Sequence, residues 1–421
     1  MSLDQIIAEL KWRGLFFEAT DENAISKLDS KDSFYIGVDP TASSLQIGNL
    51  ISLIVSVHLA RGGLKPIFLF GGATGAIGDP SGKSEERKLL TQAAVEENVK
   101  KQSKQVKTIF ERMELKPEFV NNFDWTKNLS TIDFLRDVGK YFTVNYMLAK
   151  EVVKSRLDST GISFTEFSYM ILQANDFCHL YETHNCKLQI GGSDQWGNIT
   201  AGLELIRKKI QGDAYALSWP LITDNQGRKF GKSENGTIWL DSELTSPYKF
   251  HQFWLNLDDK DAIPYLKIFS FLSKSEIDEL SKMQEASPEK REAQKKLADL
   301  VVELVHGKQA VTDAKKSAEV LFGGSFEGLS EQQLEDIFSD VPSSSIEKAK
   351  LKQMTYADVL AETKCVKSKG EAKRLISGGG AYINNERLEN PETKLTDNKC
   401  LDDNLFVLRT GKKNYHLVKM T

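Results

Sequence analysis

The chain has 421 residues, of which 40% are hydrophobic and 27% are charged, and this composition fits a soluble globular protein of two or three domains. No apolar run approaches the length of a membrane-spanning helix, and a net charge of −4 does not mark the whole chain as a nucleic-acid binder. The charge is uneven, however, because residues 348–421 carry 15 Lys and Arg against 9 Asp and Glu, whereas residues 1–347 carry 40 against 50. A basic end on an acidic body predicts a tail that faces RNA or a membrane surface.

The first 225 residues carry the pattern of an α/β domain. Residues 1–11 predict an amphipathic helix and not a signal peptide. A β-rich run at 34–38 leads through a turn to an apolar helix that starts at Gly48, and residues 67–70 are a continuous apolar run, typical of a strand covered on both faces. This β-α-β order predicts a parallel sheet. Further strands and charged helices are expected at 188–190, 217–222, 85–113 and 133–153.

The remaining residues predict three smaller parts. A mobile loop and its connection are expected at 226–245, and apolar residues recur at helical spacing over 246–324. Residues 325–348, with a Pro-Ser-Ser-Ser run, are expected to form a linker. Residues 349–421 are expected to form a small α+β unit. Its predicted helix and strands lie at 370–376, 381–384 and 405–409.

The segment 35–50 joins a strand, a turn and the start of a helix. A helix N-terminus offers unpaired backbone N–H groups and a partial positive charge, so it suits phosphate. Gly48 would let a flat nucleotide approach the backbone there. Taken singly, the segment also fits an ordinary surface turn of an α/β domain.

A Gly-rich segment at 71–83 follows the next strand, where α/β sheets bind ligands. Its Asp79 can hold a cationic amine, and Lys83 with the nearby Arg87 can meet phosphate. The segment lacks the ending of a P-loop and the spacing of a dinucleotide fingerprint. A plain flexible loop is the alternative.

Three polar residues, Tyr169, Gln173 and Asp176, are spaced so that they share one face of a helix. Apolar neighbours flank them, so the stripe can line a pocket for a small polar ligand. A solvent-facing stripe is the alternative.

Two further segments suit a nucleotide. The strand at 188–190 runs into Gly-Gly, and Asp194 is well placed for the hydroxyl pair of a ribose. In the Gly-bounded loop 227–234, Lys229 and Lys232 can close on a triphosphate, although lysines in loops are often merely solvated. No Ser-His-Asp arrangement or metal-ligand cluster is recognisable, so an enzyme of this sequence would work by positioning and electrostatics.

In their order and spacing, these five segments resemble the bacterial-type tyrosyl-tRNA synthetases, a family of class I aminoacyl-tRNA synthetases. Residues 45–49, Leu-Gln-Ile-Gly-Asn, stand where the family carries His-Ile-Gly-His, and residues 229–233, Lys-Phe-Gly-Lys-Ser, match its Lys-Met-Ser-Lys-Ser loop. The resemblance covers essentially the whole chain. It implies a Rossmann-like, parallel-sheet catalytic domain that activates L-tyrosine with ATP to tyrosyl-adenylate, releases pyrophosphate and transfers tyrosine to the 3′ end of tRNA(Tyr).

The resemblance also implies roles for single residues, carried over position by position. Tyr35 and Asp176 would bond the phenolic hydroxyl of tyrosine, which phenylalanine lacks. The residues expected at the α-ammonium group are Asp79, Tyr169 and Gln173, and those expected at the carboxylate side are Gln195 and Gln189. The residues expected around the nucleotide are Asp39, Gly48, Asn49, Gly192, Asp194 and Lys232. Those expected to face the phosphates are Thr41, Gln46, Lys83, Arg87, Lys229, Lys232 and Ser233. Mg²⁺ would enter with ATP, and no metal held by the protein alone is expected.

One departure from the family pattern matters. Gln46 and Asn49 replace both histidines of His-Ile-Gly-His, and these amides can donate hydrogen bonds but cannot carry charge. Loss of the first histidine is expected to slow adenylate formation more than loss of the second. The replaced histidines and the basic tail leave an alternative open, an RNA-binding protein built on a weakened synthetase body. The related tryptophan enzyme is disfavoured by Asp176, because indole has no phenolic hydroxyl.

The C-terminal residues resemble an S4-type RNA-binding domain. The likeness lies in residues 368–376 and 378–384, and it fits the basic excess of this end. The residues expected to contact RNA are Ser368, Lys369, Lys373 and Arg374. The resemblance implies that residues 246–324 form the anticodon-side helical domain and that the protein is a homodimer without a membrane partner.

The cysteines bear on the compartment. Cys178, Cys186, Cys365 and Cys400 have neither zinc nor redox spacing, so we expect reduced thiols. A cytoplasmic location is therefore expected, with the mitochondrial matrix as the alternative if a leader has been removed.

Overall fold

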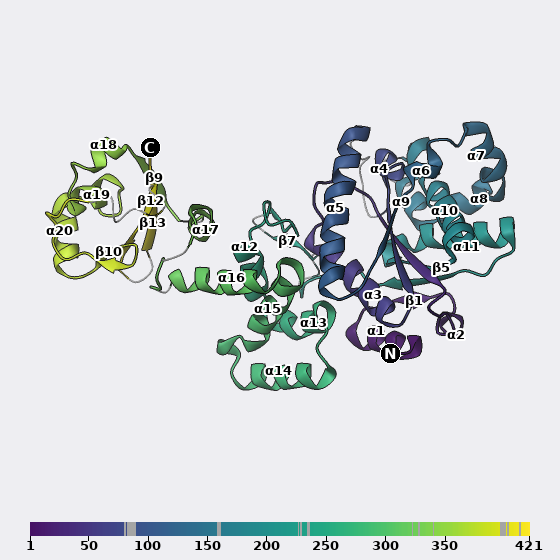
Figure 1. The fold of residues 1–421 in the computed structure, drawn as a ribbon, viewed down its shortest axis with the longest axis horizontal. Coiled ribbons are helices and arrows are strands. Elements are labelled where there is room, and N and C mark those ends of the chain that lie inside the picture. The colour runs from purple at the N-terminus through teal and green to yellow at the C-terminus, as the bar shows by residue number, and fades with distance from the viewer. Residues whose placement is uncertain are drawn as a thin grey trace. The chain divides into compact units, whose positions relative to one another are not determined.

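The computed structural model divides the chain into two compact units, Met1–Leu244 with Leu257–Leu297 and Thr245–Asn256 with Ala298–Thr421 (Figure 1). We call them the first and the second unit. The described residues are all of 1–421 except 80, 82–89, 158–160, 226, 228, 229, 234, 235, 322, 327, 328, 340, 396–400, 402, 403, 412 and 413.

The first unit is built on a six-stranded sheet in the order β1-β6-β5-β2-β3-β4. The five strands from β6 to β4 are parallel, and the two-residue β1 pairs antiparallel with β6 at the edge. The bounds are β1 Glu18–Ala19, β2 Ser33–Val38, β3 Lys65–Phe70, β4 Glu118–Asn121, β5 Cys186–Gly192 and β6 Tyr215–Trp219. The predicted parallel sheet is thus confirmed. The strands expected at 34–38, 67–70 and 188–190 are β2, β3 and β5, and the strand expected at 217–222 is β6, which ends earlier, at Trp219.

Helices cover this sheet. The helix α3 is buried on nearly all sides, as its apolar composition predicted, and α10 runs from its N-cap Ser163 to Asn185, which adopts the left-handed conformation that ends helices. The helices of the first unit are α1 Leu3–Arg13, α2 Glu22–Ile25, α3 Leu50–Arg61, α4 Thr74–Ile77, α5 Gln92–Arg112, α6 Phe123–Thr126, α7 Thr131–Asp137, α8 Val144–Leu148, α9 Glu151–Leu157, α10 Phe164–His184, α11 Trp196–Ile210, α13 Asp259–Phe269 and α14 Lys274–Ala286. Short 3₁₀ turns lie at η1 Ile47–Asn49, η2 Gly139–Tyr141, η3 Ser193–Gln195 and η4 Pro288–Lys290, and a small hairpin lies at β7 Lys232–Ser233 and β8 Gly236–Thr237.

The helix expected over 133–153 is wrong, because the chain breaks there into α7, η2, α8 and α9. Directly after η2, Phe142 adopts an extended backbone with φ −110° and ψ 111°. Thr143 then starts α8 anew, since its side chain accepts a hydrogen bond from the backbone N–H of Tyr146. An N-cap residue inside the expected helix therefore marks the start of a separate helix.

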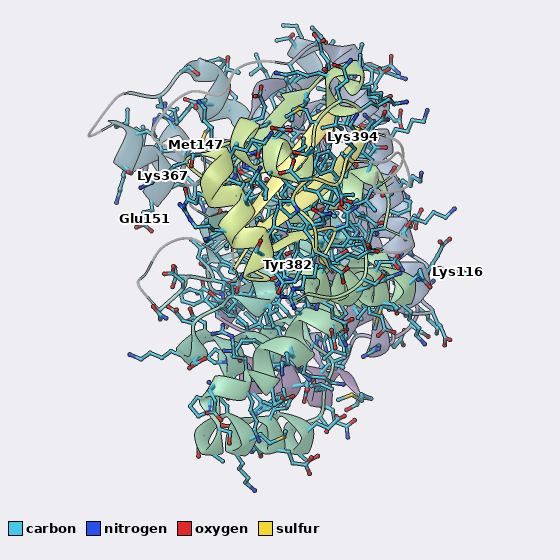
Figure 2. The ribbon with its side chains drawn as sticks, turned by 90° about the vertical axis from the view of Figure 1, so that its left-hand side faces the viewer. Lys116, Met147, Glu151, Lys367, Tyr382 and Lys394 are labelled. Carbon is cyan, nitrogen blue, oxygen red and sulfur yellow. The ribbon has the colours of Figure 1, made fainter. Side chains whose placement is uncertain are left out.

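The second unit combines helices with a five-stranded sheet in the order β11-β10-β12-β13-β9. Its helices are α12 Pro247–Leu255, α15 Glu292–His306 (which crosses the division between the units), α16 Lys308–Val320, α17 Glu331–Ile337, α18 Lys348–Leu351, α19 Tyr356–Glu362 and α20 Lys369–Ser377. Its strands are β9 Ser343–Ile346, β10 Ala381–Ile383, β11 Glu386–Arg387, β12 Leu405–Thr410 and β13 Asn414–Met420. Figure 2 labels Lys367, Tyr382 and Lys394 among the side chains of this unit.

Residues 325–348 are not a free linker. They contain α17 and the strand β9, which pairs in parallel with β13. Leu334, Ile337 and Phe338 are buried in a core that they share with β12 and β13. The serines of 343–345 suggested a linker, but backbone pairing with β13 does not require apolar side chains. The expected helical domain at 246–324 is likewise divided, with α13 and α14 in the first unit and α12 and α16 in the second.

Among the described residues, no helix is both long enough and apolar enough to cross a membrane.

Candidate active site

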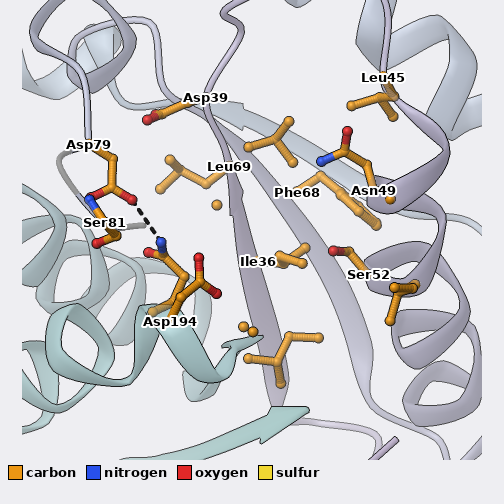
Figure 3. A pocket seen from close by; sticks show the side chains of 18 of the residues that line it. Ile36, Asp39, Leu45, Asn49, Ser52, Phe68, Leu69, Asp79, Ser81 and Asp194 are labelled. Carbon is orange, nitrogen blue, oxygen red and sulfur yellow. Dashed lines mark hydrogen bonds between the residues drawn. The ribbon is translucent and has the colours of Figure 1, made fainter. Parts of the chain in front are cut away.

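A pocket of about 430 Å³ opens in the first unit beside the carboxyl ends of β2 and β5 (Figure 3). The chain builds the sheet from β2 outward to β4 and then returns to place β5 on the other side of β2, so the pocket lies at the switch point where open α/β sheets bind ligands. Every predicted active-site residue whose side chain is described lines this pocket. These residues are Tyr35, Asp39, Thr41, Gln46, Gly48, Asn49, Asp79, Tyr169, Gln173, Asp176, Gln189, Gly192, Asp194 and Gln195.

Tyr35 occupies the buried end of the pocket. Its side chain is fully buried with its ring 5.2 Å from that of Phe177, and its Oη atom has no hydrogen-bond partner among the described residues. Burial, reinforced by the nearby Asp176 carboxylate, holds the pKa of the Tyr35 hydroxyl well above its ordinary value. The hydroxyl therefore remains a neutral donor that awaits an acceptor.

Asp176 is held at both carboxylate oxygens. Trp125 donates its Nε1–H to Oδ1 over 2.8 Å, and Asn122 donates its Nδ2–H to Oδ2 over 2.9 Å. Burial raises the pKa of Asp176 to about 7, although the two donors oppose that rise. A carboxylate offers about four acceptor positions, so Asp176 can still accept from a ligand.

Sequence reasoning missed Asn122 and Trp125. Asn122 directly follows β4 and Trp125 lies in the next helix, α6. The four residues of β4 are at most partly buried and gave no apolar run by which the strand could be predicted. A polar residue at the carboxyl end of a parallel strand was the signal available, once β4 was known.

Tyr169 bonds a different carboxylate from the one expected to share its role. Its Oη donates to Asp39 Oδ2 over 2.9 Å, and Thr74 Oγ1 donates to the other oxygen over 3.2 Å. Burial, and then the charge of Asp39, holds the pKa of the Tyr169 hydroxyl well above its ordinary value. Asp39, expected on the nucleotide side, therefore lies next to the proposed ammonium site.

Asp79 is held by two side-chain amides, one from η3 (a contact drawn in Figure 3) and one from the first turn of α11. Gln195 Nε2 donates to Asp79 Oδ2 over 2.7 Å, and Asn198 Nδ2 lies 3.4 Å from Oδ1, which also accepts the backbone N–H of Ser81. The carboxylate is 6% exposed. Its negative charge thus faces the pocket in a fixed orientation.

The segment that carries Gln46 and Asn49 is tied to the chain beyond the loop. Backbone bonds join Leu45 and Ile47 to residues 238–240, and the N–H of Gln46 donates to Asn49 Oδ1 over 2.9 Å. The loop itself lies close by, since a Cβ at Gly231 would stand 2.6 Å from Ile47 Cγ2. The amide oxygen of Asn49 is therefore occupied by the hydrogen bond that stabilises the turn at Gln46.

Five predicted phosphate-side residues are not placed. Lys83, Arg87 and Lys229 lie outside the described residues, and the side chains of Lys232 and Ser233 do as well, although the backbone of these two forms β7.

The predicted RNA contacts lie on α20 of the second unit. Ser368 is its N-cap, Lys369 pairs with Asp358 over 2.6 Å, and Lys373 pairs with Glu392 over 2.5 Å. The hydrogen bond from Lys369, ahead of that from Thr355, lowers the pKa of Asp358 to about 2. Arg374 is exposed on the same helix.

The switch-point pocket on a parallel sheet and the sequence comparisons together define a class I aminoacyl-tRNA synthetase. Residues 27–323 match the family described as tRNA synthetases class I (W and Y), and residues 333–418 match the Tyrosine--tRNA ligase SYY-like C-terminal domain. The second match starts inside the segment that was expected to be a linker, in accord with the pairing of β9.

Full-length relatives specify the family further. The tyrosine–tRNA ligase of Bacillus velezensis is 50% identical over 422 residues, which cover 99% of this chain and 100% of the relative, and that of Roseiflexus castenholzii is 47% identical over 420 residues, which cover 99% of each. A C-terminally truncated mitochondrial tyrosyl-tRNA synthetase of Aspergillus nidulans superposes with a TM-score of 0.68 at 29% identity, over 75% of this chain and 94% of that one. The chain belongs to the tyrosyl-tRNA synthetase family.

Proposed function

We propose that this tyrosine–tRNA ligase recognises its amino acid at the Tyr35–Asp176 end of the pocket. The unpartnered Tyr35 Oη is the observation that carries the proposal, because a phenolic oxygen placed there would accept its hydrogen. The phenolic O–H would in turn donate to Asp176. Phenylalanine would leave the buried Tyr35 hydroxyl without a partner, which costs about 1–3 kcal/mol, and would offer no donor to Asp176.

The α-ammonium group is assigned to the acidic middle of the pocket. Asp79 supplies a fixed charge, and Tyr169 and Gln173 line the same cavity. Asp39 adds a second carboxylate through its contact with Tyr169. The carboxylate side of tyrosine is assigned to Gln195 and Gln189, whose side chains line the same pocket.

ATP, entering with Mg²⁺, is assigned to the other side of the pocket. Gly192 supports the placement of the ribose, since a Cβ there would stand 2.6 Å from Asp194 Oδ1 and fill the space before that carboxylate. Thr41 and Gln46 line the same pocket and would contact the phosphates. Side chains predicted from the sequence would contact the negatively charged pyrophosphate as it leaves. They are Lys83, Arg87, Lys229 and Lys232, together with Ser233.

A homodimer is proposed from the exposed surface of the first unit. Large apolar side chains are exposed on helices that follow one another along the chain, from α7 to the start of α10. They are Ile132, Leu135, Val144, Leu148, Leu157 and Phe164. Such exposure is typical of a surface that another protein covers. Phe164→Asp is expected to give a monomer in sedimentation, and an unchanged dimer would exclude Phe164 from the interface.

The second unit is assigned to tRNA(Tyr), through α20 and the basic excess of residues 348–421. A reducing compartment such as a bacterial cytoplasm is proposed as well, supported by the free thiols of Cys178, Cys186 and Cys365.

Exchange of pyrophosphate into ATP, measured with tyrosine, phenylalanine or tryptophan, tests the assignment of the pocket. Tyrosine alone is expected to support exchange, and Asp176→Ala is expected to abolish the preference for tyrosine over phenylalanine. Absence of exchange with any amino acid, together with binding of structured RNA, would favour the alternative function. In that alternative, suggested by Gln46 and Asn49, the chain is an RNA-binding protein built on a catalytically weakened synthetase body.

A further inference from the structure

The indole of Trp125 is held at two points by one turn of α10. Its Nε1–H donates to Asp176 Oδ1 over 2.8 Å, and the imidazole of His179 lies parallel to its rings, with centroids 4.3 Å apart and planes inclined by 22°. Asp176 and His179 are three residues apart, so they share a face of the helix. One helix face thus both accepts the indole hydrogen and stacks against the indole ring.

The stack can orient Trp125 because this residue lies on the very short helix α6. The helix α6 has four residues, and Trp125 and His179 are both only half-buried. The ends of so short a helix are not fixed by its own hydrogen bonds. Contacts from outside α6, those of α10 among them, therefore set the orientation of the indole.

His179 meets Trp125 as a neutral aromatic ring. Burial, followed by the positive charge that His184 can carry, lowers the pKa of His179 below its ordinary value of 6.5, against the opposing influence of Glu182. At neutral pH the ring is then uncharged, and an offset stack with indole is a favourable arrangement. A flat apolar ring of similar size would serve as well.

We propose that His179 is a positioning residue for recognition of the tyrosine hydroxyl. By stacking on Trp125 it keeps the indole N–H directed at Asp176, and Asp176 keeps the orientation in which it accepts the phenolic O–H of the substrate. The inference rests on the proposed role of Asp176.

Three variants of the full chain test this, with pyrophosphate exchange measured for tyrosine and phenylalanine. For His179→Ala, loss of an aromatic pair is expected to raise the KM for tyrosine, and to lower the preference for tyrosine over phenylalanine, by about two- to tenfold. The KM for ATP is expected to stay unchanged. His179→Phe, which keeps a ring over the indole, is expected to restore both values. His184→Ala on the same helix is the matched control, because His184 contacts Glu118, makes no stack with Trp125 and affects His179 only through its charge. It should resemble the parent chain, since loss of that charge leaves the His179 ring in place.

The outcomes separate this inference from the assignment of the pocket. A parent chain that does not prefer tyrosine, or an Asp176→Ala variant that keeps the preference, would overturn the assignment itself. If Asp176→Ala loses the preference but His179→Ala keeps it, the positioning role of His179 is overturned. The role is also overturned if His179→Phe is as impaired as His179→Ala, or if the KM for ATP rises in parallel with that for tyrosine.

Discussion

Tyr35 and Gln189 are register partners on the parallel strands β2 and β5, and each ends in a buried oxygen that has no hydrogen-bond partner among the described residues. Two such oxygens on neighbouring strands at the wall of one pocket indicate that their partners come with the ligand. The strand pairing fixes the spacing of the two side chains before any substrate binds. The unpartnered hydroxyl distinguishes Tyr35 from Tyr169, the other buried tyrosine of the site, whose hydroxyl donates to Asp39.

Tyr35→Phe is expected to weaken recognition without weakening the fold. The lost hydrogen bond should raise the KM for tyrosine about two- to tenfold and leave that for phenylalanine unchanged. The midpoint of thermal unfolding should be equal or higher, because the variant removes a buried hydroxyl that no protein group satisfies.

Tyr169→Phe is the matched control for that variant. The Tyr169 hydroxyl does have a protein partner, Asp39, at 2.9 Å. Its removal should lower the free energy of unfolding by about 1–3 kcal/mol. Equal losses of stability in Tyr35→Phe and Tyr169→Phe, measured by denaturant unfolding, would contradict the unpartnered state of Tyr35.

The affinity for tyrosine should rise with pH through neutrality. The folded-state pKa of Asp176 is raised to about 7, so the acceptor is half protonated there and fully ionised only above pH 8. The KM for tyrosine should therefore fall between pH 6 and pH 8. Asp176→Asn, which carries no proton to lose, should remove this pH dependence, and a parallel profile in the variant would assign the titration to another group.

The same group bears on stability with the opposite sign. A carboxyl whose pKa is raised on folding binds more protons in the folded than in the unfolded state between about pH 4 and pH 7. Its contribution to the free energy of unfolding is therefore present at low pH and is lost as the pH rises toward 7. In Asp176→Asn this decline should disappear from the difference between the two unfolding curves.

The sequence predicted side chains that do line one pocket, because strand ends and motif positions determine which side chains meet. Tyr35, Asp79, Asp176 and Asp194 stand far apart in the chain, yet a parallel sheet brings its carboxyl ends to one edge. Roles within the pocket were harder to predict. Helical spacing put Tyr169 on the correct face, but it could not decide between Asp39 and Asp79 as the hydrogen-bond partner, because that depends on how two loops pack.

Elements without an apolar signature were missed for a similar reason. The short strand β4 is held by pairing with β3, and β9 by pairing with β13, so neither needs a hydrophobic run. Because β4 was not predicted, Asn122 and Trp125 after it were missed. In place of β9, a linker was expected. Backbone pairing of this kind is set by neighbours distant in sequence, which composition does not reveal.

An aromatic cluster on α13 is expected to anchor the loop that follows β6. The ring of Phe230 stacks on Phe269 with centroids 4.9 Å apart and meets Tyr265 edge-on at 5.0 Å. Since the loop lysines are assigned to the phosphates, Phe230→Ala should lower kcat for adenylate formation about tenfold and leave the KM for tyrosine nearly unchanged. Phe230→Leu, which keeps an apolar side chain, should lose less. A rise in the KM for tyrosine with an unchanged kcat would exclude anchoring of the loop by this cluster.

The positions of β9 and α17 determine where the chain can be truncated without exposing a core. A variant ending at residue 348 would leave β9 without its partner β13 and expose Leu334 and Phe338, whose core includes β12 and β13. Ending the chain at residue 324 removes those side chains together with the sheet. We expect both variants to form tyrosyl-adenylate and to lose tRNA charging, but the longer one to aggregate more at equal concentration, because it retains apolar groups whose cover is gone. Exchange assays, charging assays and light scattering on the two variants check this, and normal tRNA charging by either variant would show that residues 349–421 are not needed for tRNA binding.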